Sequence, residues 1–280
     1  MWRFFFWLCR QIFVTLHEIV RTMKNITLLF LSLLLIMACG SKTESGNAVA
    51  PSSPTDIILY DLHQDRVNCV ISAEPPGDRP WSLAVGEWLD ERLGGCYDGD
   101  PRDMKSLVHF YGEAKADSLR AALEDPNPGV EVEFEATMTK AYETDRFITY
   151  TLCTYIGLGG AHPLTTEEGA TFRKSDGRRL DWNIVRCNMS VELNDVIKGS
   201  LMDYTGMKDD EELEQLMSMA GVDIYNLPLP KNPPYLLENG VAFIYQQYEI
   251  MSYAMGMPAD TIAYDRMRPL LTRTAQKLIP

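Results

Sequence analysis

The 280-residue sequence predicts an α+β fold: an antiparallel sheet made of hairpins, with helices packed on one face. Three observations lead to this class. Helical and strand patterns occur in separate blocks along the chain, which is typical of α+β proteins. Residues 130–139 alternate strictly between apolar and polar side chains, as a strand with one buried face does. Asp-Gly and Asn-Gly pairs separate several extended segments, which indicates hairpins.

The part of the chain over 57–129 predicts one strand and two helices. Residues 66–72 have the composition of a strand and precede a Pro-Gly break. Apolar residues then recur at helical spacing over 81–89, and two glycines at 94–95 end this helix. A second helix begins after Asp103, which can cap it, and ends before a Pro-rich turn. We therefore expect a smaller N-terminal α/β portion here.

The sheet is predicted from the middle of the chain. Its clearest strand is the alternating segment 130–139, which has one apolar face and one acidic face. A second strand, 146–156, is rich in β-branched and aromatic residues. An Asp-Gly turn at 176–177 joins the short extended segments 171–172 and 180–182. We expect these segments to pair as antiparallel hairpins.

The last third of the chain predicts two helices, a hairpin and a closing helix. Residues 191–204 and 209–220 show amphipathic periodicity, and the second segment is acidic at its start, where the helix dipole favours carboxylates. An Asn-Gly turn at 239–240 separates two extended segments, which predicts another hairpin. Residues 261–271 predict a short extended piece and a helix. We expect residues 130–280 to form the larger domain.

The first 38 residues predict a leader and lipoprotein signal peptide. The apolar stretch 26–37 is shorter than the ~20 residues that span a bilayer. It runs into Ala-Cys-Gly at 38–40, which resembles a bacterial lipobox, a motif whose cysteine receives a diacylglycerol before cleavage. We expect lipidation at Cys39, and we expect residues 1–22 to lie upstream of the true start at Met23. The alternative is a signal anchor with an incidental cysteine.

Residues 39–56 are small, polar and Pro-containing, and they predict a lipidated flexible tether. The expected location is the bacterial cell envelope, outside the cytoplasm, on the outer-membrane or periplasmic side. The lipid anchor makes the membrane a partner of this chain, since each buried CH₂ of an acyl chain contributes ~0.8 kcal/mol.

The charge balance excludes one class of partner. The chain has 26 Lys and Arg residues against 39 Asp and Glu residues, a net charge of −13 at pH 7. Without the leader, 22 basic and 38 acidic residues remain. Such a surface repels phosphate backbones, so we expect no nucleic-acid binding, and it favours a cationic protein partner.

Four cysteines lie in the body of the chain: Cys69, Cys96, Cys153 and Cys187. An even number outside the cytoplasm predicts two disulfides. Of the three possible pairings we expect Cys69–Cys96 and Cys153–Cys187, because each bridge then stays within one half of the structure. The spacings contain no C-x-x-C, so we expect no structural zinc site.

The sequence contains none of the common catalytic motifs. It has no G-x-S-x-G elbow and no P-loop, and its one His-Glu pair lies in the leader. The three histidines of the body, His63, His109 and His162, lie far apart in sequence. We therefore predict no catalytic residue, no metal ligand and no cofactor.

A glycine-rich segment after the second strand of the sheet is the candidate partner-binding site. Its adjacent glycines permit positive φ or a close backbone approach, and its histidine can donate or accept a hydrogen bond. Three tyrosines downstream, at 245, 248 and 253, are interpreted as an aromatic contact surface for the same partner. The predicted contact residues are Gly159, Gly160, His162, Tyr245 and Tyr248. The alternatives are a sheet corner that the histidine fixes, and tyrosines that pack in the core.

These residues carry a family resemblance. The segment Tyr155-x-Gly157-x-Gly159-Gly160-Ala161-His162 is followed by an Asp-Gly hairpin and, much later, by residues 237–245, Tyr248-Glu249-Ile250 and Tyr253-Ala254-x-Gly256. In this order they resemble the RsiV-like domain, the extracellular domain shared by a lysozyme-sensing anti-sigma factor and PdaC-type peptidoglycan deacetylases. The resemblance covers residues 130–280. It implies an α+β envelope domain that binds a partner or cell-wall material.

Two departures from that family shape the expected function. We expect a cleavable lipoprotein signal instead of a cytoplasmic segment with a transmembrane helix, and we expect no separate metal-dependent deacetylase domain. We predict a lipid-anchored, non-catalytic envelope binding module that contacts a cationic protein, such as lysozyme, or peptidoglycan. The alternatives are a cell-wall glycan-modifying enzyme that uses His162 with an Asp or Glu, and a structural subunit of an envelope complex.

Overall fold

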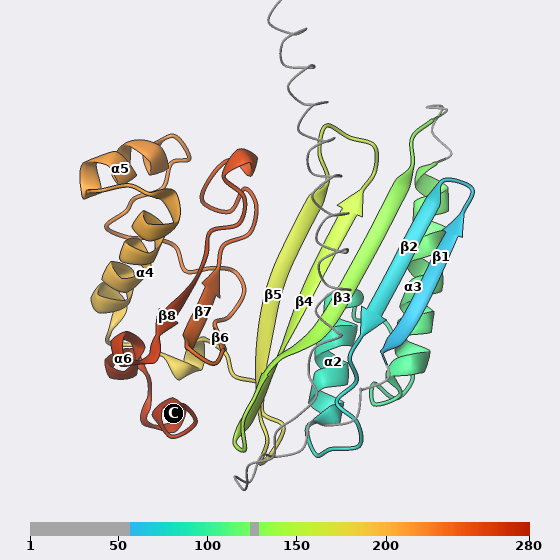
Figure 1. Ribbon diagram of the computed structural model, residues 1–280, viewed down its shortest axis with the longest axis horizontal. Coiled ribbons are helices and arrows are strands. Elements are labelled where there is room, and N and C mark those ends of the chain that lie inside the picture. The colour runs from blue at the N-terminus through green and yellow to red at the C-terminus, as the bar shows by residue number, and fades with distance from the viewer. Residues whose placement is uncertain (1–56, 124–128) are drawn as a thin grey trace, which may run out of the picture. The chain divides into compact units, whose positions relative to one another are not determined.

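A computed structural model describes residues 57–123 and 129–280 (Figure 1). The predicted leader, the lipidation site Cys39 and the predicted tether lie outside these residues. Within the described ranges, no helix combines the length and the apolar character needed to cross a membrane.

Two sheets, each with its own helices, follow one another along the described chain. The first sheet and its helices are β1 (Ile58–Gln64), β2 (Val67–Ala73), α2 (Ser82–Leu93), α3 (Met104–Ala122), β3 (Val132–Glu143), β4 (Phe147–Gly157) and β5 (Leu164–Arg173). The second sheet and its helices are α4 (Ser190–Thr205), α5 (Asp210–Ser218), β6 (Tyr235–Leu236), β7 (Gly240–Ile244), β8 (Ala259–Ala263), α6 (Tyr264–Met267) and α7 (Arg273–Gln276). Single turns of 3-10 helix lie at η1 (Trp182–Ile184), η2 (Tyr253–Met255) and η3 (Arg268–Leu270).

The first sheet has the strand order β1-β2-β3-β4-β5, and the predicted α+β class is confirmed. Its neighbouring strands are antiparallel except for β2 and β3, which run parallel. The parallel pair differs from the predicted all-antiparallel sheet. It arises because α2 and α3 form the connection between these two strands and return the chain to the same end of the sheet.

Both helices of this crossover pack on one face of the first sheet, as predicted (Figure 1). Asp103 caps α3, since its Oδ1 accepts a hydrogen bond from the Ser106 amide at 3.1 Å. Trp88 of α2 and Tyr111 of α3 are almost fully buried against the apolar side chains of the sheet, among them Phe134. The opposite face of β3 carries exposed acidic and threonine side chains. The strict alternation in the sequence therefore corresponds to one buried face and one solvent-exposed, or wet, face.

The predicted boundary at residue 129 falls between β2 and β3, which are neighbours in the first sheet. Residues on both sides of this boundary also belong to one hydrophobic cluster. The N-terminal portion and the segment that follows it therefore share one sheet and one core.

The second sheet, β6-β7-β8, has a core of its own, to which α4, α5 and the C-terminal residues contribute. All five residues of β7 are buried. The predicted helices 191–204 and 209–220 are confirmed as α4 and α5, and the predicted Asn-Gly hairpin is confirmed as β6 and β7. The Asp-Gly turn after β5 also forms, but its second arm makes only a single bridge, between Phe172 and Arg179, before η1 begins.

The two sheets are joined by two buried threonines. Thr171 Oγ1 of β5 accepts the Leu236 amide at 2.8 Å, and Thr149 Oγ1 of β4 donates to the Leu236 carbonyl at 2.6 Å. The two hydroxyls lie 2.8 Å apart and bond to each other. Both backbone groups of Leu236 are thereby satisfied in the interior, as buried peptide groups must be.

The four cysteines form no disulfide in the described part of the chain, so neither Cys69–Cys96 nor Cys153–Cys187 is present. Cys69 points from β2 into the core, its Sγ lies 3.6 Å from the Gly112 carbonyl oxygen, and burial raises the pKa of its thiol to about 11. Cys96 is exposed in the loop after α2. Cys153 lies on the wet face of β4, and Cys187 is exposed before α4. Because side chains alternate along a strand, Cys69 on β2 points into the core, whereas Cys153 on β4 points to solvent.

Candidate functional site

His162, Tyr248 and Tyr253 meet at the surface and form what we call the aromatic cluster. The imidazole of His162 stacks on the ring of Tyr253, with centroids 4.0 Å apart and an interplanar angle of 15°. The hydroxyl of Tyr248 lies 3.5 Å from His162 Nε2, and the two tyrosine rings lie 5.6 Å apart. The structure therefore brings two predicted contact residues together, although they are 86 positions apart in sequence.

Glycine at position 159 is required by the loop that presents His162. This loop joins β4 to β5, and Gly159 adopts a φ of +72°, in the region that favours glycine. A Cβ at this position would lie 2.1 Å from Cγ1 of Val130, so a larger residue could not pack there. Gly160 has open space around its Cα and an ordinary φ, so its predicted role has no steric basis in the fold.

The segment that carries Tyr248 is bound to the outer edge of β5 by two glutamine side chains. Gln246 Oε1 accepts the Glu167 amide at 3.1 Å, and Gln246 Nε2 donates to the Glu167 carbonyl at 2.7 Å. Gln247 Oε1 accepts the Thr165 amide at 3.0 Å. These side-chain amides take the place of a neighbouring strand, and they satisfy edge groups that would otherwise be open to pairing.

The carboxylate of Glu249 stabilises the turn that carries Tyr248. Glu249 accepts the backbone amide of Gln246 at 2.8 Å with one oxygen and that of Lys231 at 2.7 Å with the other. Each oxygen of Glu249 thus accepts one backbone amide, and the side chain fixes the shape of the turn. Together with the two glutamines, Glu249 ties this turn to neighbouring segments by hydrogen bonds.

Tyr248 itself has a φ of +64° and is 59% exposed. A left-handed backbone is unfavourable for a bulky side chain, at a cost of about 1–2 kcal/mol. Because glycine or asparagine would occupy this turn without that cost, the presence of an exposed tyrosine needs another reason. Strained residues of this kind gather at functional sites.

Tyr245 does not belong to the site, and its predicted role in partner contact is wrong. It is 2% exposed, and its hydroxyl donates to the Pro228 carbonyl at 2.7 Å. Burial raises the pKa of this phenol. The register of β7 continues into this residue and turns it into the second core.

A hollow of about 330 Å³ adjoins Tyr248 and was not predicted from the sequence. Met251 and Met255 line it from the tyrosine segment, and Leu216 and Met219 line it from the end of α5. Ser252 also lines it, and Met219 is 79% exposed. Methionine side chains adapt to differently shaped apolar partners, so the hollow extends the aromatic cluster as a contact surface. Only tertiary proximity marks it, since these residues lie in two separate segments.

Tyr155 lies on the wet face of the first sheet, beside this surface. It pairs with Glu135 on β3, and it shares the face with Glu133 and Glu167. Partial desolvation and the nearby Glu133 carboxylate raise the pKa of its phenol. The site is therefore aromatic and apolar at its centre, with carboxylates along the adjoining sheet face.

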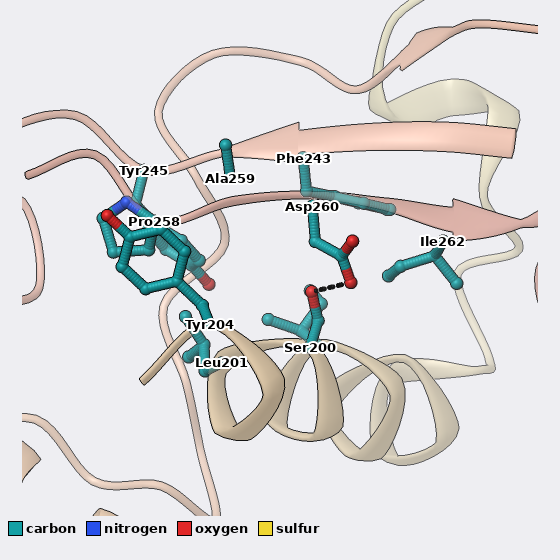
Figure 2. A pocket seen from close by; sticks show the side chains of 10 residues that line it. Ser200, Leu201, Tyr204, Phe243, Tyr245, Pro258, Ala259, Asp260 and Ile262 are labelled. Carbon is teal, nitrogen blue, oxygen red and sulfur yellow. Dashed lines mark hydrogen bonds between the residues drawn. The ribbon is translucent and has the colours of Figure 1, made fainter. Parts of the chain in front are cut away.

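A second concave site lies between α4 and β8 (Figure 2). Ser200 points from α4 to Asp260 and donates to Oδ2 at 2.6 Å, while Oδ1 of Asp260 accepts the Thr261 amide at 2.7 Å. The space is about 10 Å³, enough for roughly one water. None of its ten lining residues is a histidine, and the Ser200 hydroxyl serves as a hydrogen-bond donor between helix and strand.

Metal-ligating side chains do not gather elsewhere in the ranges 57–123 and 129–280. No group of three or more His, Cys, Asp or Glu residues in them has a geometry that could hold a metal ion. His162 likewise has no carboxylate hydrogen-bonded to its ring among the described residues.

Comparison with known proteins gives a family match and a fold. Residues 187–265, which run from just before α4 into α6, match the family model described as "Protein of unknown function (DUF3298)". This match includes Tyr248 and Tyr253 but not His162. No curated protein matches the sequence.

Two solved structures share the fold. A member of the DUF3298 family from Bacteroides fragilis NCTC 9343 aligns with a TM-score of 0.63 and 19% identity, over 78% of this chain and 93% of the other. A DUF3298 family protein from Pseudomonas aeruginosa PAO1 aligns with a TM-score of 0.54 and 13% identity, over 80% of this chain and 97% of the other. The chain thus carries a DUF3298 segment, within a fold that these DUF3298 family proteins also adopt.

Proposed function

We propose that this chain is a lipid-anchored binding module of the bacterial cell envelope, of the RsiV-like type, without catalysis of its own. Its contact surface is the aromatic cluster with the adjoining methionine hollow. The observation that carries the proposal is Tyr248, an exposed aromatic residue held in a left-handed backbone conformation beside His162. Such a residue costs stability, and recognition of a partner offsets that cost.

The preformed geometry supports binding. Association costs less free energy when the contact side chains are already ordered, and stacked aromatic rings with fixed turns meet that condition. Tyrosines are common among the residues that dominate binding energy, because they combine a large apolar surface with a polar hydroxyl. His162 faces tyrosines rather than a carboxylate, which favours partner contact over acid–base catalysis on a glycan.

The local charge favours a cationic protein as the partner. Eleven acidic and only two basic residues lie between Leu201 and Asp265, the stretch that contains α5 and the tyrosine segment. A positively charged protein such as lysozyme would be steered to this region, whereas a hollow lined mostly by methionine and leucine offers few hydrogen bonds to a sugar. Peptidoglycan is therefore the second partner class rather than the first.

Binding of the full chain to hen lysozyme, measured by surface plasmon resonance in detergent, tests the proposal. We expect Tyr248→Ala to weaken binding about tenfold or more, as truncation of a dominant contact does, and we expect slower association at higher salt, because salt screens the steering charges. Tyr225→Ala is the matched control, because Tyr225 is 63% exposed but lies outside the cluster.

Two results would contradict the proposal. One is equal binding by the wild type and Tyr248→Ala. The other is the absence of binding to both lysozyme and insoluble peptidoglycan at low and at moderate salt. If the chain binds only peptidoglycan and Tyr248→Ala loses that binding, the protein is still a binding module. Its partner is then cell-wall material and not a cationic protein.

A further inference from the structure

The molecule has a basic region at the end opposite the aromatic cluster. Residues 173–186 and 266–280 contain nine basic and two acidic residues, in a chain whose net charge is −13. Backbone hydrogen bonds hold the two segments side by side: the Thr272 amide donates to the Ile184 carbonyl at 2.7 Å, and the Arg186 amide donates to the Leu270 carbonyl at 2.8 Å. Figure 1 shows the turn after β5 and the C-terminus at the lower end, and α5 at the upper end.

A pocket of about 170 Å³ opens between these two segments. Its polar lining includes the side chains of Arg173, Arg178, Asn183 and Thr274. Its floor is formed by buried apolar residues of the second core, among them Leu278. No acidic residue lines it. A concave site with arginines and an apolar floor is unusual for a chain this acidic.

Some polar side chains of the pocket are bound to other protein groups, and others are not. Arg173 is paired with Asp176, whose carboxylate accepts from Arg173 Nε at 2.8 Å, and this pairing lowers the pKa of Asp176 to about 2. The guanidinium of Arg178 forms no salt bridge among the residues described, since Asp176 pairs with Arg173, although the charge of Arg178 also helps to lower the pKa of Asp176. The amide of Asn183 and the hydroxyl of Thr274 likewise have no protein hydrogen-bond partner there. One unpaired cation and two neutral donors therefore face the same space.

We propose that this pocket binds a carboxylate carried on a short apolar chain, such as the C-terminal end of a peptide. The planar guanidinium of Arg178 offers two parallel N–H donors, which match the two oxygens of a carboxylate. Asn183 and Thr274 supply further donors. A single unpaired positive charge balances a monoanion, whereas a phosphate group carries more charge than the pocket neutralises. The apolar floor contacts the carbon atoms next to the carboxylate.

The test uses the full chain in detergent and ligand-detected saturation-transfer NMR, which reports weak binding. The probes are N-acetyl-alanyl-alanine with a free carboxylate, the same peptide as its C-terminal amide, and inorganic phosphate. We expect the free acid to bind, the amide not to bind, and phosphate to compete poorly. Arg178→Gln removes the charge from an exposed position and is expected to weaken binding about tenfold. Arg273→Gln, a neighbouring exposed arginine outside the pocket lining, is the matched control and is expected to bind like the wild type.

Three outcomes overturn this inference. They are equal binding of the acid and the amide, equal losses in Arg178→Gln and Arg273→Gln, and tighter binding of phosphate than of the acid. The result does not depend on the proposed partner contact, because the aromatic cluster and this pocket share no residue.

Discussion

The two sheets of this protein are buried in different ways. The first sheet is covered by α2 and α3 on one face and exposes acidic residues and threonines on the other. In the second sheet, β7 is buried at all five positions. A strand with one wet face shows itself by alternation, whereas a strand covered on both faces shows only a short apolar run. This difference explains why β3 is the clearest strand in the sequence.

The sheets also meet along β5, and this contact decides whether they unfold together. The Thr149–Thr171 pair binds Leu236, the side chains of Gln246 and Gln247 cover the edge, and Tyr235 lies on Gly169.

The largest effect is expected for Gly169→Ala. An added Cβ would lie 2.4 Å from the ring of the buried Tyr235, and overpacking of this kind costs about 3 kcal/mol of unfolding free energy. If the sheets form one cooperative unit, urea unfolding followed by circular dichroism and by tryptophan fluorescence will give one coincident transition at lower urea.

Two further variants check this interpretation. Tyr235→Leu should make room, so that Gly169→Ala costs less in the Tyr235→Leu background than in the wild type. Gly160→Ala, at an open position, should change stability by less than about 0.5 kcal/mol. Two separate transitions in Gly169→Ala would show that the sheets unfold independently.

The next effect concerns the opposite face of β5, where Glu168 lies beneath α2. Its side chain is 10% exposed, and Arg92 Nε lies 2.7 Å from Oε2 without the alignment of a hydrogen bond, so charge attraction carries the contact. Burial raises the pKa of Glu168, while the charge of Arg92 lowers it in part. Arg92→Met removes the nearest positive charge from a buried carboxylate, while that of Arg179 remains nearby, and should cost about 2 kcal/mol at pH 8.

The sign of the pH dependence follows from the raised pKa. The folded state holds the proton of Glu168 more tightly than the unfolded state, so its contribution to stability falls as pH rises from the unfolded pKa through the folded one. Without Arg92 that folded pKa rises further, and the loss in Arg92→Met should be smaller at pH 5 than at pH 8. Thermal unfolding at the two pH values measures this, and an equal loss at both would contradict the charge argument.

The smallest change in stability is expected at the turn bound to the edge of β5. Tyr248→Asn replaces a strained tyrosine by a residue that tolerates the left-handed region, and should raise the unfolding free energy by up to about 1 kcal/mol. The same substitution should weaken binding of a partner at the aromatic cluster. A loss of stability together with unchanged binding would show that Tyr248 serves the fold alone.

Much of the fold could be predicted because local patterns agreed with the tertiary structure. The capping of α3 by Asp103, the alternation along β3 and the Asn-Gly turn before β7 all depend on nearby residues. The parallel pairing of β2 with β3 could not be predicted, because it depends on the path of two helices across the sheet rather than on the composition of either strand.

The candidate site was predicted in part for the same reason. His162 and Tyr248 stood out locally as a histidine after glycines and as a tyrosine after a strand, and the structure brings them together. Tyr245 had the same local appearance, but the register of β7 turns it into the core. The methionine hollow and the arginine pocket each combine separate segments, and no local pattern indicates either of them.

By itself, the sequence determined the α+β class, the positions of most helices and turns, and the acidic balance, because these depend on composition and on contacts between near neighbours. Only the tertiary structure decided which side chains face outward together. It separates an acidic, aromatic end from a basic end within one acidic chain, and it turns Cys69 and Tyr245 inward. The physical reason is that burial and proximity are set by the packing of segments that are distant in sequence.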